Sequence, residues 1–215
     1  MKTRIFVMRH GDRADDSDAF KDLVDRPFDP PLSPMGIKTT ERVVNERLHE
    51  IDAIFSSPFL RCVQTAAVAQ NLLNVSSCII DSGIIEVWHP RVLKSSLCDI
   101  LLRTDAELLQ FVPRAIFKHG FQSLPFVIND EGETQGIGGS ADQRFRSSLT
   151  RIAIDSAKSG YRSILVVTHG DCINTVGEMA GKDIYSVDYC GLIVVDFIDS
   201  SWQFVDSFGI GILDF

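Results

Sequence analysis

Two short apolar segments of this chain each lead into a histidine followed by a glycine. Residues 5–8 precede Arg9-His10-Gly11, and residues 163–167 precede Thr168-His169-Gly170. A short apolar run bounded by a glycine and charged residues is typical of a buried strand. A guanidinium binds anions, and a neutral imidazole is a nucleophile near neutral pH. The two motifs indicate an anion site at one edge of a sheet, where Gly11 is expected to let the backbone turn sharply.

A third cationic side chain is expected at the same edge. Ser56-Ser57-Pro58 ends another apolar segment, and Arg61 follows in the first turn of the next predicted helix. A helix N-terminus presents free amide groups and a positive dipole end, and an arginine fork fits phosphate oxygens. Ligands of parallel sheets bind beyond the carboxyl ends of the strands. An isolated arginine in a first turn is more often solvated, but two histidines and Arg9 beside it favour one shared site.

The elements that must position these residues alternate between strand and helix. Apolar runs predict strands near 3–8, 52–58, 78–81, 163–168, 192–198 and 202–208, and helical spacing predicts helices over 34–50, 58–73, 105–118, 140–158 and 171–180. Ser33 is expected to cap the first helix, with Pro34 in its first turn. The alternation predicts one α/β domain over residues 1–215, a three-layer α/β/α sandwich around a mainly parallel sheet.

Two stretches interrupt this alternation. Residues 12–31 are polar and rich in proline, without helical or strand period, which predicts a loop over the end of the first strand. Residues 90–140 contain a short apolar segment, a predicted helix and a glycine-rich tail. We interpret residues 90–140 as an insertion that covers the active site and shapes its specificity.

Composition limits the classes of partner. The formal net charge of -8 argues against general binding to nucleic acid or anionic membranes, although a cleft can still be locally basic. No apolar run is long enough to cross a membrane. The five cysteines are odd in number and none are spaced as CxxC, which argues against a zinc site and for a reducing compartment. We expect a cytoplasmic protein without a metal or cofactor, and the 192–208 strand pair offers an edge for a homodimer.

Three motifs, in this order and spacing over nearly the whole chain, resemble the histidine phosphatase superfamily, also called phosphoglycerate mutase-like. They are Arg9-His10-Gly11, Ser56-Ser57-Pro58-x-x-Arg61-Cys62-x-Gln64-Thr65-Ala66 and Thr168-His169-Gly170. The resemblance implies the phosphoglycerate mutase-like fold. It also implies that His10 is the nucleophile that becomes phosphorylated and that Glu86 donates the proton. The implied phosphate pocket is Arg9, Arg61, His169 and Gly170.

Further residues narrow the resemblance to particular branches. Arg9-His10-Gly11-x-Arg13 resembles the acid phosphatase branch and the ubiquitin-associated/SH3 (suppressor of T-cell receptor signalling) branch, in which the extra arginine contributes to the phosphate site. Glu86-Val87-Trp88 also looks like the latter branch and its relatives, the ecdysteroid-phosphate phosphatases. The resemblance therefore implies Arg13 as a further phosphate ligand.

These residues fit hydrolysis of a phosphomonoester without a metal ion. Guanidinium groups can neutralise the phosphoryl oxygens, a neutral imidazole can accept the phosphoryl group, and a carboxylic acid can protonate the leaving alcohol. Glu86 can begin protonated only if burial or neighbouring negative charge raises its pKa. Asp171 is a rival acid, because the acid phosphatase branch places an aspartate directly after its second histidine, where Gly170 stands here. Asp12 is a weaker rival.

Two other functions stay open. A bisphosphoglycerate-dependent phosphoglycerate mutase would carry Glu-Ser-x-x-Asn after Arg-His-Gly, whereas Asp12-Arg13-Ala14-Asp15-Asp16 stands here. A catalytically silent module that binds phosphorylated ligands would keep the pocket but needs neither nucleophile nor acid. Gly132-Glu133-Thr134 loosely resembles a Gly-Glu-Ser motif of the broader family, or is a polar loop before a helix. The substrate, a phosphorylated small molecule or a phosphoprotein, is not identified by the sequence.

Overall fold

A computed structural model describes residues 2–120, 132–136 and 138–213 of the chain. The strands are β1 (Lys2–Arg9), β2 (Ala53–Ser56), β3 (Cys78–Ile80), β4 (Phe117–His119), β5 (Ser163–Thr168), β6 (Asp183–Ile198) and β7 (Ser201–Leu213). The α-helices are α1 (Pro34–Arg47), α2 (Leu60–Leu73), α3 (Pro90–Leu93), α4 (Asp105–Phe111), α5 (Ser140–Lys158) and α6 (Gly170–Met179). Short 3-10 helices lie at Ala14–Asp16, Asp18–Leu23, Ser82–Ile84 and Leu97–Asp99.

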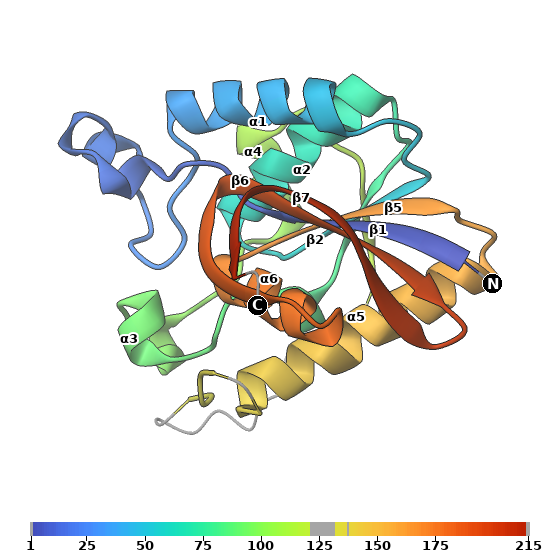
Figure 1. The fold of residues 1–215 in the computed structure, drawn as a ribbon. Coiled ribbons are helices and arrows are strands. Elements are labelled where there is room, and N and C mark those ends of the chain that lie inside the picture. Colours follow the sequence, from blue (N-terminus) through green and yellow to red (C-terminus); the bar gives the residue numbers. More distant parts are fainter. Residues whose placement is uncertain (1, 121–131, 137, 214–215) are drawn as a thin grey trace.

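The strands form one seven-stranded sheet in the order β4-β3-β2-β5-β1-β6-β7. The first five of these strands are parallel to one another, and β6 and β7 add an antiparallel hairpin at one edge, where β6 pairs with β1. Helices α1, α2 and α4 lie over one face of the sheet, and α5 and α6 lie over the other (Figure 1). The predicted fold class, a layered α/β fold with a mainly parallel sheet, is confirmed.

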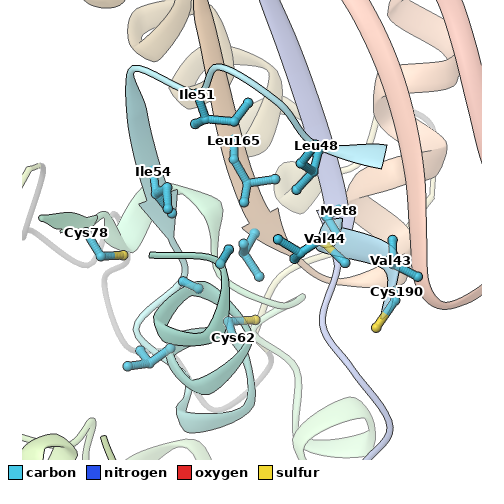
Figure 2. Packing of buried hydrophobic residues seen from close by; sticks show 14 of the residues in the cluster. Met8, Val43, Val44, Leu48, Ile51, Ile54, Cys62, Cys78, Leu165 and Cys190 are labelled. Carbon is cyan, nitrogen blue, oxygen red and sulfur yellow. The ribbon is translucent and has the colours of Figure 1, made fainter. Parts of the chain in front are cut away.

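The period of two along the central strands explains the layering. Met8 and Leu165 face the helices α1 and α2, where they pack with Val44 and Ile54 (Figure 2). Side chains at alternate positions of β1 and β5 face α5 and α6 instead; Ile5, Val7, Ile164 and Val166 are fully buried there. Because both faces are covered, these strands read as unbroken apolar runs rather than as alternating ones.

The start of α1 confirms its predicted cap. Ser33 Oγ accepts a hydrogen bond from the Gly36 amide at 2.9 Å, and Pro34 is the first helical residue. The helix ends at Arg47, three residues before the predicted end at Glu50. The capping bond satisfies an amide that the helix itself leaves unpaired, and it marks where the 12–31 loop ends.

The helix predicted over 105–118 is wrong in its second half. Helix α4 ends at Phe111, and residues 117–119 form β4, which pairs with β3. Pro113 explains the early end, because proline disfavours helical backbone in the residue before it and lacks the amide hydrogen of a helix interior. The expectation that residues 90–140 cover the site falls partly outside the described residues, since residues 121–131 and 137 are not among them.

The two C-terminal strands are longer than the predicted 192–198 and 202–208. Strands β6 and β7 pair from the Asp199-Ser200 turn down to Asp183 and Leu213, with shifts of register between Val187 and Leu192. Both turn residues have positive φ, as two-residue hairpin loops require. The prediction stopped at Leu192 because the shifted segment breaks the apolar alternation.

Candidate active site

The carboxyl ends of three adjacent strands bring the predicted residues together. The His10 amide donates a hydrogen bond to the Thr168 carbonyl at 3.0 Å, which joins the ends of β1 and β5. The Ser57 amide donates to the Val167 carbonyl at 3.0 Å, which joins the end of β2 to β5. His10, His169 and the N-terminus of α2, with Arg61, therefore meet at one edge of the sheet.

His10 is held with the lone pair of one ring nitrogen facing Arg61. Its side chain is buried, and Nδ1 lies 2.8 Å from the Gly11 carbonyl oxygen. Because a carbonyl only accepts and Arg61 Nε only donates, at 3.3 Å from Nε2, Nδ1 carries the hydrogen and Nε2 carries the lone pair. Burial lowers the pKa of His10 well below its ordinary value, and the charges of Arg61, Arg9 and Arg13 act in the same direction. His10 is thus a neutral imidazole whose Nε2 faces a guanidinium.

Gly11 is needed for close packing rather than for a sharp turn. Its φ does not lie in the left-handed region, so the backbone conformation itself does not require a glycine. A Cβ at this position would lie 2.8 Å from the Gly36 carbonyl oxygen and 2.8 Å from Thr40 Oγ1. The Gly11 amide donates to Thr65 Oγ1 at 3.0 Å. The absence of a side chain therefore lets the segment after β1 lie directly against α1 and α2.

His169 lies beside His10, with the two ring centroids 5.4 Å apart. Its side chain is fully buried; Nε2 lies 2.9 Å from Ser57 Oγ, and Nδ1 lies 3.3 Å from both Arg61 Nη2 and Glu86 Oε2. Burial and the Arg61 charge lower the pKa of His169 well below its ordinary value. A neutral His169 can accept from Arg61 at Nδ1 and donate from Nε2 to the serine hydroxyl.

Arg61 connects the two imidazoles. The side chain is buried; Nε faces His10 and Nη2 faces His169, as described above. Its third nitrogen, Nη1, lies 3.5 Å from the Phe28 carbonyl oxygen and 4.0 Å from Asp29 Oδ1. Because Arg61 is the second residue of α2, its charge adds to the positive end of that helix.

Arg9 lies on the side of the site that faces β6. Its Nη1 donates to the Val187 carbonyl at 2.6 Å, and its guanidinium carbon lies 4.1 Å from the centroid of the Tyr189 ring. Arg9 Nε is buried and has no hydrogen-bond partner among the described residues. Gly170, the first residue of α6, adjoins this nitrogen, because a Cβ there would lie 3.6 Å from it. The structure thus brings an unsatisfied cationic donor and a helix N-terminus together.

Arg13 is paired with a neighbouring carboxylate. Its Nε lies 2.8 Å from Asp15 Oδ1 and its Nη2 lies 2.6 Å from Asp15 Oδ2, a two-bond fork that leaves Nη1 outside the pair. The charge of Arg13 reaches the site, since it contributes to the lowered pKa of His10. The charge of Arg13 therefore acts on the site, while two of its three guanidinium nitrogens are bonded to Asp15.

Glu86 lies where a proton donor is expected. Its side chain is 14% exposed, and Oε2 lies 3.3 Å from His169 Nδ1 and 3.9 Å from Arg61 Nη2. Burial raises the pKa of Glu86, and although Arg61 opposes this shift, the negative charge of Asp171 adds to it. The arrangement favours a carboxylic acid that is protonated at higher pH than an exposed glutamate.

The two rival acids are placed differently. Asp171 is exposed at the N-terminus of α6 and accepts a hydrogen bond from Gln135 Nε2 at 3.3 Å. Asp12 accepts a hydrogen bond from Ser33 Oγ at the start of α1. Neither has a contact with His10, His169 or Arg61 among the interactions found, so Glu86 is the carboxyl group that adjoins the imidazoles.

Sequence reasoning missed the ion pair that holds the Glu86 segment. Arg144 Nε and Nη2 lie 2.8 Å from the two carboxylate oxygens of the buried Glu133, and Arg144 also donates to the carbonyl oxygens of Ile85 and Glu86 at 3.2 Å. Glu133 Oε2 accepts from the Trp88 amide at 2.9 Å. The resemblance of residues 132–134 to a family motif was the available signal. The pair fixes the backbone on both sides of Glu86.

No group of three or more His, Cys, Asp or Glu side chains in the described ranges is arranged to hold a metal ion. No helix found in the described part of the chain has the length and apolar character to span a membrane.

Comparison with known proteins identifies the family of this chain. Residues 5–111 match the model of the histidine phosphatase superfamily (branch 1). This match contains Arg9, His10, Arg13, Arg61 and Glu86. The chain belongs to the histidine phosphatase superfamily and is an enzyme of the phosphatase class. No curated protein sequence is close enough to count as a match.

Several solved structures have the same fold. The ecdysone phosphate phosphatase from Bombix mori, in complex with tungstate, is 16% identical, with 95% of this chain and 92% of that chain covered and a TM-score of 0.65. A phosphoglycerate mutase from Bacillus anthracis is 16% identical, covering 97% and 93%, with a TM-score of 0.61. The putative phosphohistidine phosphatase SixA from Agrobacterium tumefaciens is 18% identical, covering 96% and 97%, with a TM-score of 0.54. The predicted phosphoglycerate mutase-like fold is confirmed.

Proposed function

We propose that this protein is a metal-independent phosphomonoester hydrolase that works through a phosphohistidine at His10. The observation that carries the proposal is the buried, neutral His10 with Nε2 3.3 Å from Arg61 Nε. Arg61 Nε donates to the lone pair on Nε2, so a fixed cation lies beside the nucleophilic nitrogen, and a phosphate oxygen that takes over this donor would free the lone pair to attack. A phosphoryl group bound by Arg61 would present its phosphorus to Nε2.

Arg9, Arg61, His169 and Gly170 form the phosphate pocket in this proposal. Phosphoryl transfer demands charge neutralisation around three equatorial oxygens, with the attacking and leaving atoms in line. Two guanidiniums remain charged at any working pH, and the first turn of α6 supplies amide donors. The buried Arg9 Nε without a partner among the described residues supports this assignment, since it has a hydrogen bond left to donate.

Arg13 is proposed to join the pocket when phosphate binds. Nη1 lies outside its pair with Asp15, so the side chain can donate to a phosphate oxygen without leaving the carboxylate. This assignment is supported by the effect of the Arg13 charge on His10.

Glu86 is proposed to act as acid and then as base. In the first step the phosphorus–oxygen ester bond breaks, His10 Nε2 bonds to phosphorus, and the protonated Glu86 gives its proton to the leaving oxygen. In the second step Glu86 takes a proton from water, whose oxygen attacks phosphorus and releases His10. The raised pKa of Glu86 supports the first step, because the acid must begin protonated.

The substrate class is a phosphorylated small molecule or a phosphoprotein. The names of the structural neighbours suggest a panel of a steroid phosphate and a phosphohistidine protein. The phosphoglycerate mutase among them makes bisphosphoglycerate-dependent isomerisation the second candidate. Isomerisation of 3-phosphoglycerate by the chain would favour that candidate.

We also propose a single domain over residues 1–215 in a reducing, cytoplasmic compartment. Cys62, Cys78, Cys172 and Cys190 are buried free thiols, which supports a reducing environment. A homodimer through the hairpin is a related proposal, supported by the position of β7 at the edge of the sheet.

The test is hydrolysis of p-nitrophenyl phosphate in the presence of EDTA, with wild type beside His10→Ala. We expect turnover in the wild type and its loss in the variant, with unchanged circular dichroism in both. Equal turnover in His10→Ala, or turnover that requires an added divalent metal, would overturn the proposal. Binding of phosphate without turnover by the wild type would favour the silent binding module instead.

A further inference from the structure

Arg103, in the 90–140 insertion, is bonded to the 12–31 loop. Its side chain is 2% exposed, and Nε lies 2.8 Å from Asp29 Oδ2. Arg103 Nη1 lies 2.9 Å from Asp25 Oδ2, and the guanidinium carbon lies 4.8 Å from the centroid of the Phe111 ring. A buried guanidinium with this many partners fixes where the loop carboxylates sit.

Asp29 joins this ion pair to Arg61. While Oδ2 faces Arg103, Oδ1 accepts a hydrogen bond from the Leu60 amide at 2.6 Å and lies 4.0 Å from Arg61 Nη1. The neighbouring Phe28 carbonyl oxygen lies 3.5 Å from the same Nη1. Asp29 therefore stands between two buried guanidiniums, at the N-terminus of the helix that carries one of them.

We propose that Arg103 is a positioning residue that sets the direction of the Arg61 fork by neutralising Asp29. Arg103 neutralises Asp29, so that Arg61 keeps Nε and Nη2 on the histidines and its charge stays available to the substrate phosphate. The inference rests on the proposed function, since it assigns Arg61 to phosphate binding.

The buried charges explain why the position of Arg61 depends on Arg103. A buried carboxylate is costly to leave without a cation, and the closer guanidinium, Arg103, supplies one. Without Arg103, Arg61 is the cation that remains beside Asp29. An attraction between buried charges only 4.0 Å apart would draw the fork toward Asp29 and away from His10 Nε2.

The experiment measures the affinity for inorganic phosphate by calorimetry and as an inhibition constant. Arg103→Met removes the charge but keeps an apolar side chain, and we expect phosphate binding about tenfold weaker. The double variant Asp29→Asn with Arg103→Met removes the carboxylate that diverts Arg61, and it should recover most of the affinity. Asp29→Asn alone should bind phosphate no more weakly than the wild type.

Arg26→Met is the matched control. The Arg26 side chain pairs with Glu107 and donates to the Leu101 carbonyl, so it ties the same two segments together, and only the Arg26 backbone carbonyl, which the substitution keeps, contacts Asp29. We expect wild-type affinity in this control. If Arg103→Met does not fold, Arg103→Lys, which keeps the charge, should retain phosphate affinity within about threefold, and Asp29→Asn is tested as before.

Three results would overturn the inference: unchanged phosphate affinity in a folded Arg103→Met, a double variant no better than the single one, or an equal loss in Arg26→Met. A wild type that neither binds phosphate nor hydrolyses an ester would overturn the proposed function. If the wild type is active and Arg103→Met binds phosphate as tightly as the wild type, only the positioning role is overturned.

Discussion

At the scale of single residues, the site depends on which ring nitrogen of each histidine is protonated. The Gly11 carbonyl requires a hydrogen on His10 Nδ1, and Arg61 then faces the lone pair on Nε2. For His169, the serine hydroxyl on Nε2 and Arg61 on Nδ1 favour the opposite tautomer. Arg61 thus contacts one nitrogen of each ring. A substitution that removes the partner of the other nitrogen should therefore change kcat.

Ser57→Ala tests the hydroxyl behind His169. The substitution removes the partner 2.9 Å from Nε2, so the ring can rotate and we expect kcat to fall about tenfold. Ser56→Ala is the matched control, because its equally buried hydroxyl donates to the Ser57 carbonyl at 2.8 Å and does not contact His169. Steady-state kinetics on p-nitrophenyl phosphate compares the two. Equal effects would mean that the hydroxyl serves only local packing.

Glu86→Gln tests the proton donor. We expect kcat/KM to fall by about 10² or more for an alkyl phosphate, whose leaving oxygen needs a proton, and much less for p-nitrophenyl phosphate. The raised pKa implies that kcat/KM for the alkyl ester declines only when the pH rises through the pKa of Glu86, and the variant should lose that decline. Asp171→Asn should change little. A larger loss in Asp171→Asn than in Glu86→Gln would exchange the two assignments.

The sequence could predict the residues that stand in contiguous motifs at strand ends. His10, Arg61 and His169 meet as expected, because parallel neighbouring strands bring their carboxyl ends together whatever the rest of the chain does. Tyr189 and Arg103 could not be predicted. Their contacts depend on a shift of strand register and on how an irregular insertion packs, and neither leaves a periodic pattern.

At the scale of elements, the irregular part of β6 shapes the pocket. Cys190 has a φ of 59°, and the pairing with β7 shifts between Val187 and Leu192. Such an irregularity turns side chains and carbonyls away from the regular ladder. Here it aims the Val187 carbonyl and the Tyr189 ring at Arg9, so an edge strand supplies a wall of a site built at the centre of the sheet.

Tyr189→Leu tests this wall. A ring face near a guanidinium contributes roughly 0.5–2 kcal/mol, so its loss should lower kcat/KM by about fivefold. Tyr189→Phe keeps the ring and loses only the hydroxyl bond to Asp16, and it should stay near wild type. The measurement is kcat/KM of both variants on the same substrate. A loss in Tyr189→Phe as large as in Tyr189→Leu would assign the effect to the hydroxyl.

Elements that depend on tertiary contact were harder to predict than those with their own signals. The start of α1 followed from Ser33 and Pro34. By contrast, β4 has three residues and exists because β3 offers an unpaired edge, so its sequence carried no strand period. Without Pro113, the spacing of apolar residues in this stretch predicts a continuation of α4.

At the scale of the whole molecule, burying two neutral histidines makes stability depend on pH. Unfolded histidines titrate near pH 6.5, whereas burial lowers the pKa of both His10 and His169 in the folded state. Below about pH 6.5 the unfolded chain therefore binds more protons, and the free energy of unfolding falls as the pH falls. Glu86, with its raised pKa, acts in the opposite direction.

His10→Gln should reduce this dependence. Each buried neutral histidine contributes up to about 1.4 kcal/mol per pH unit below its unfolded pKa, so the variant should lose less stability between pH 6.5 and pH 5 than the wild type. Urea unfolding in phosphate-free buffers measures the difference. An identical slope in both proteins would mean that the pKa of His10 is the same in the folded and unfolded states.

The alternation of strands and helices was enough to predict the layered α/β fold, because a mainly parallel sheet must be covered on both faces. The substrate could not be predicted, since we expect the residues that contact a leaving group to lie partly on the irregular 90–140 insertion, which carries no recognisable motif for that group. The chemistry at phosphorus is more directly accessible to experiment than the identity of that group.

The most direct test of the account is to trap the phosphoenzyme. Wild type, His10→Ala and Glu86→Gln are mixed with p-nitrophenyl phosphate, quenched in alkali, digested and mapped by mass spectrometry. We predict a phosphoryl group on Nε2 of His10 in the wild type, more of it in Glu86→Gln because the second step lacks its base, and none in His10→Ala. A phosphoryl group on another residue, or turnover with no phosphorylated His10 in either active protein, would contradict the account.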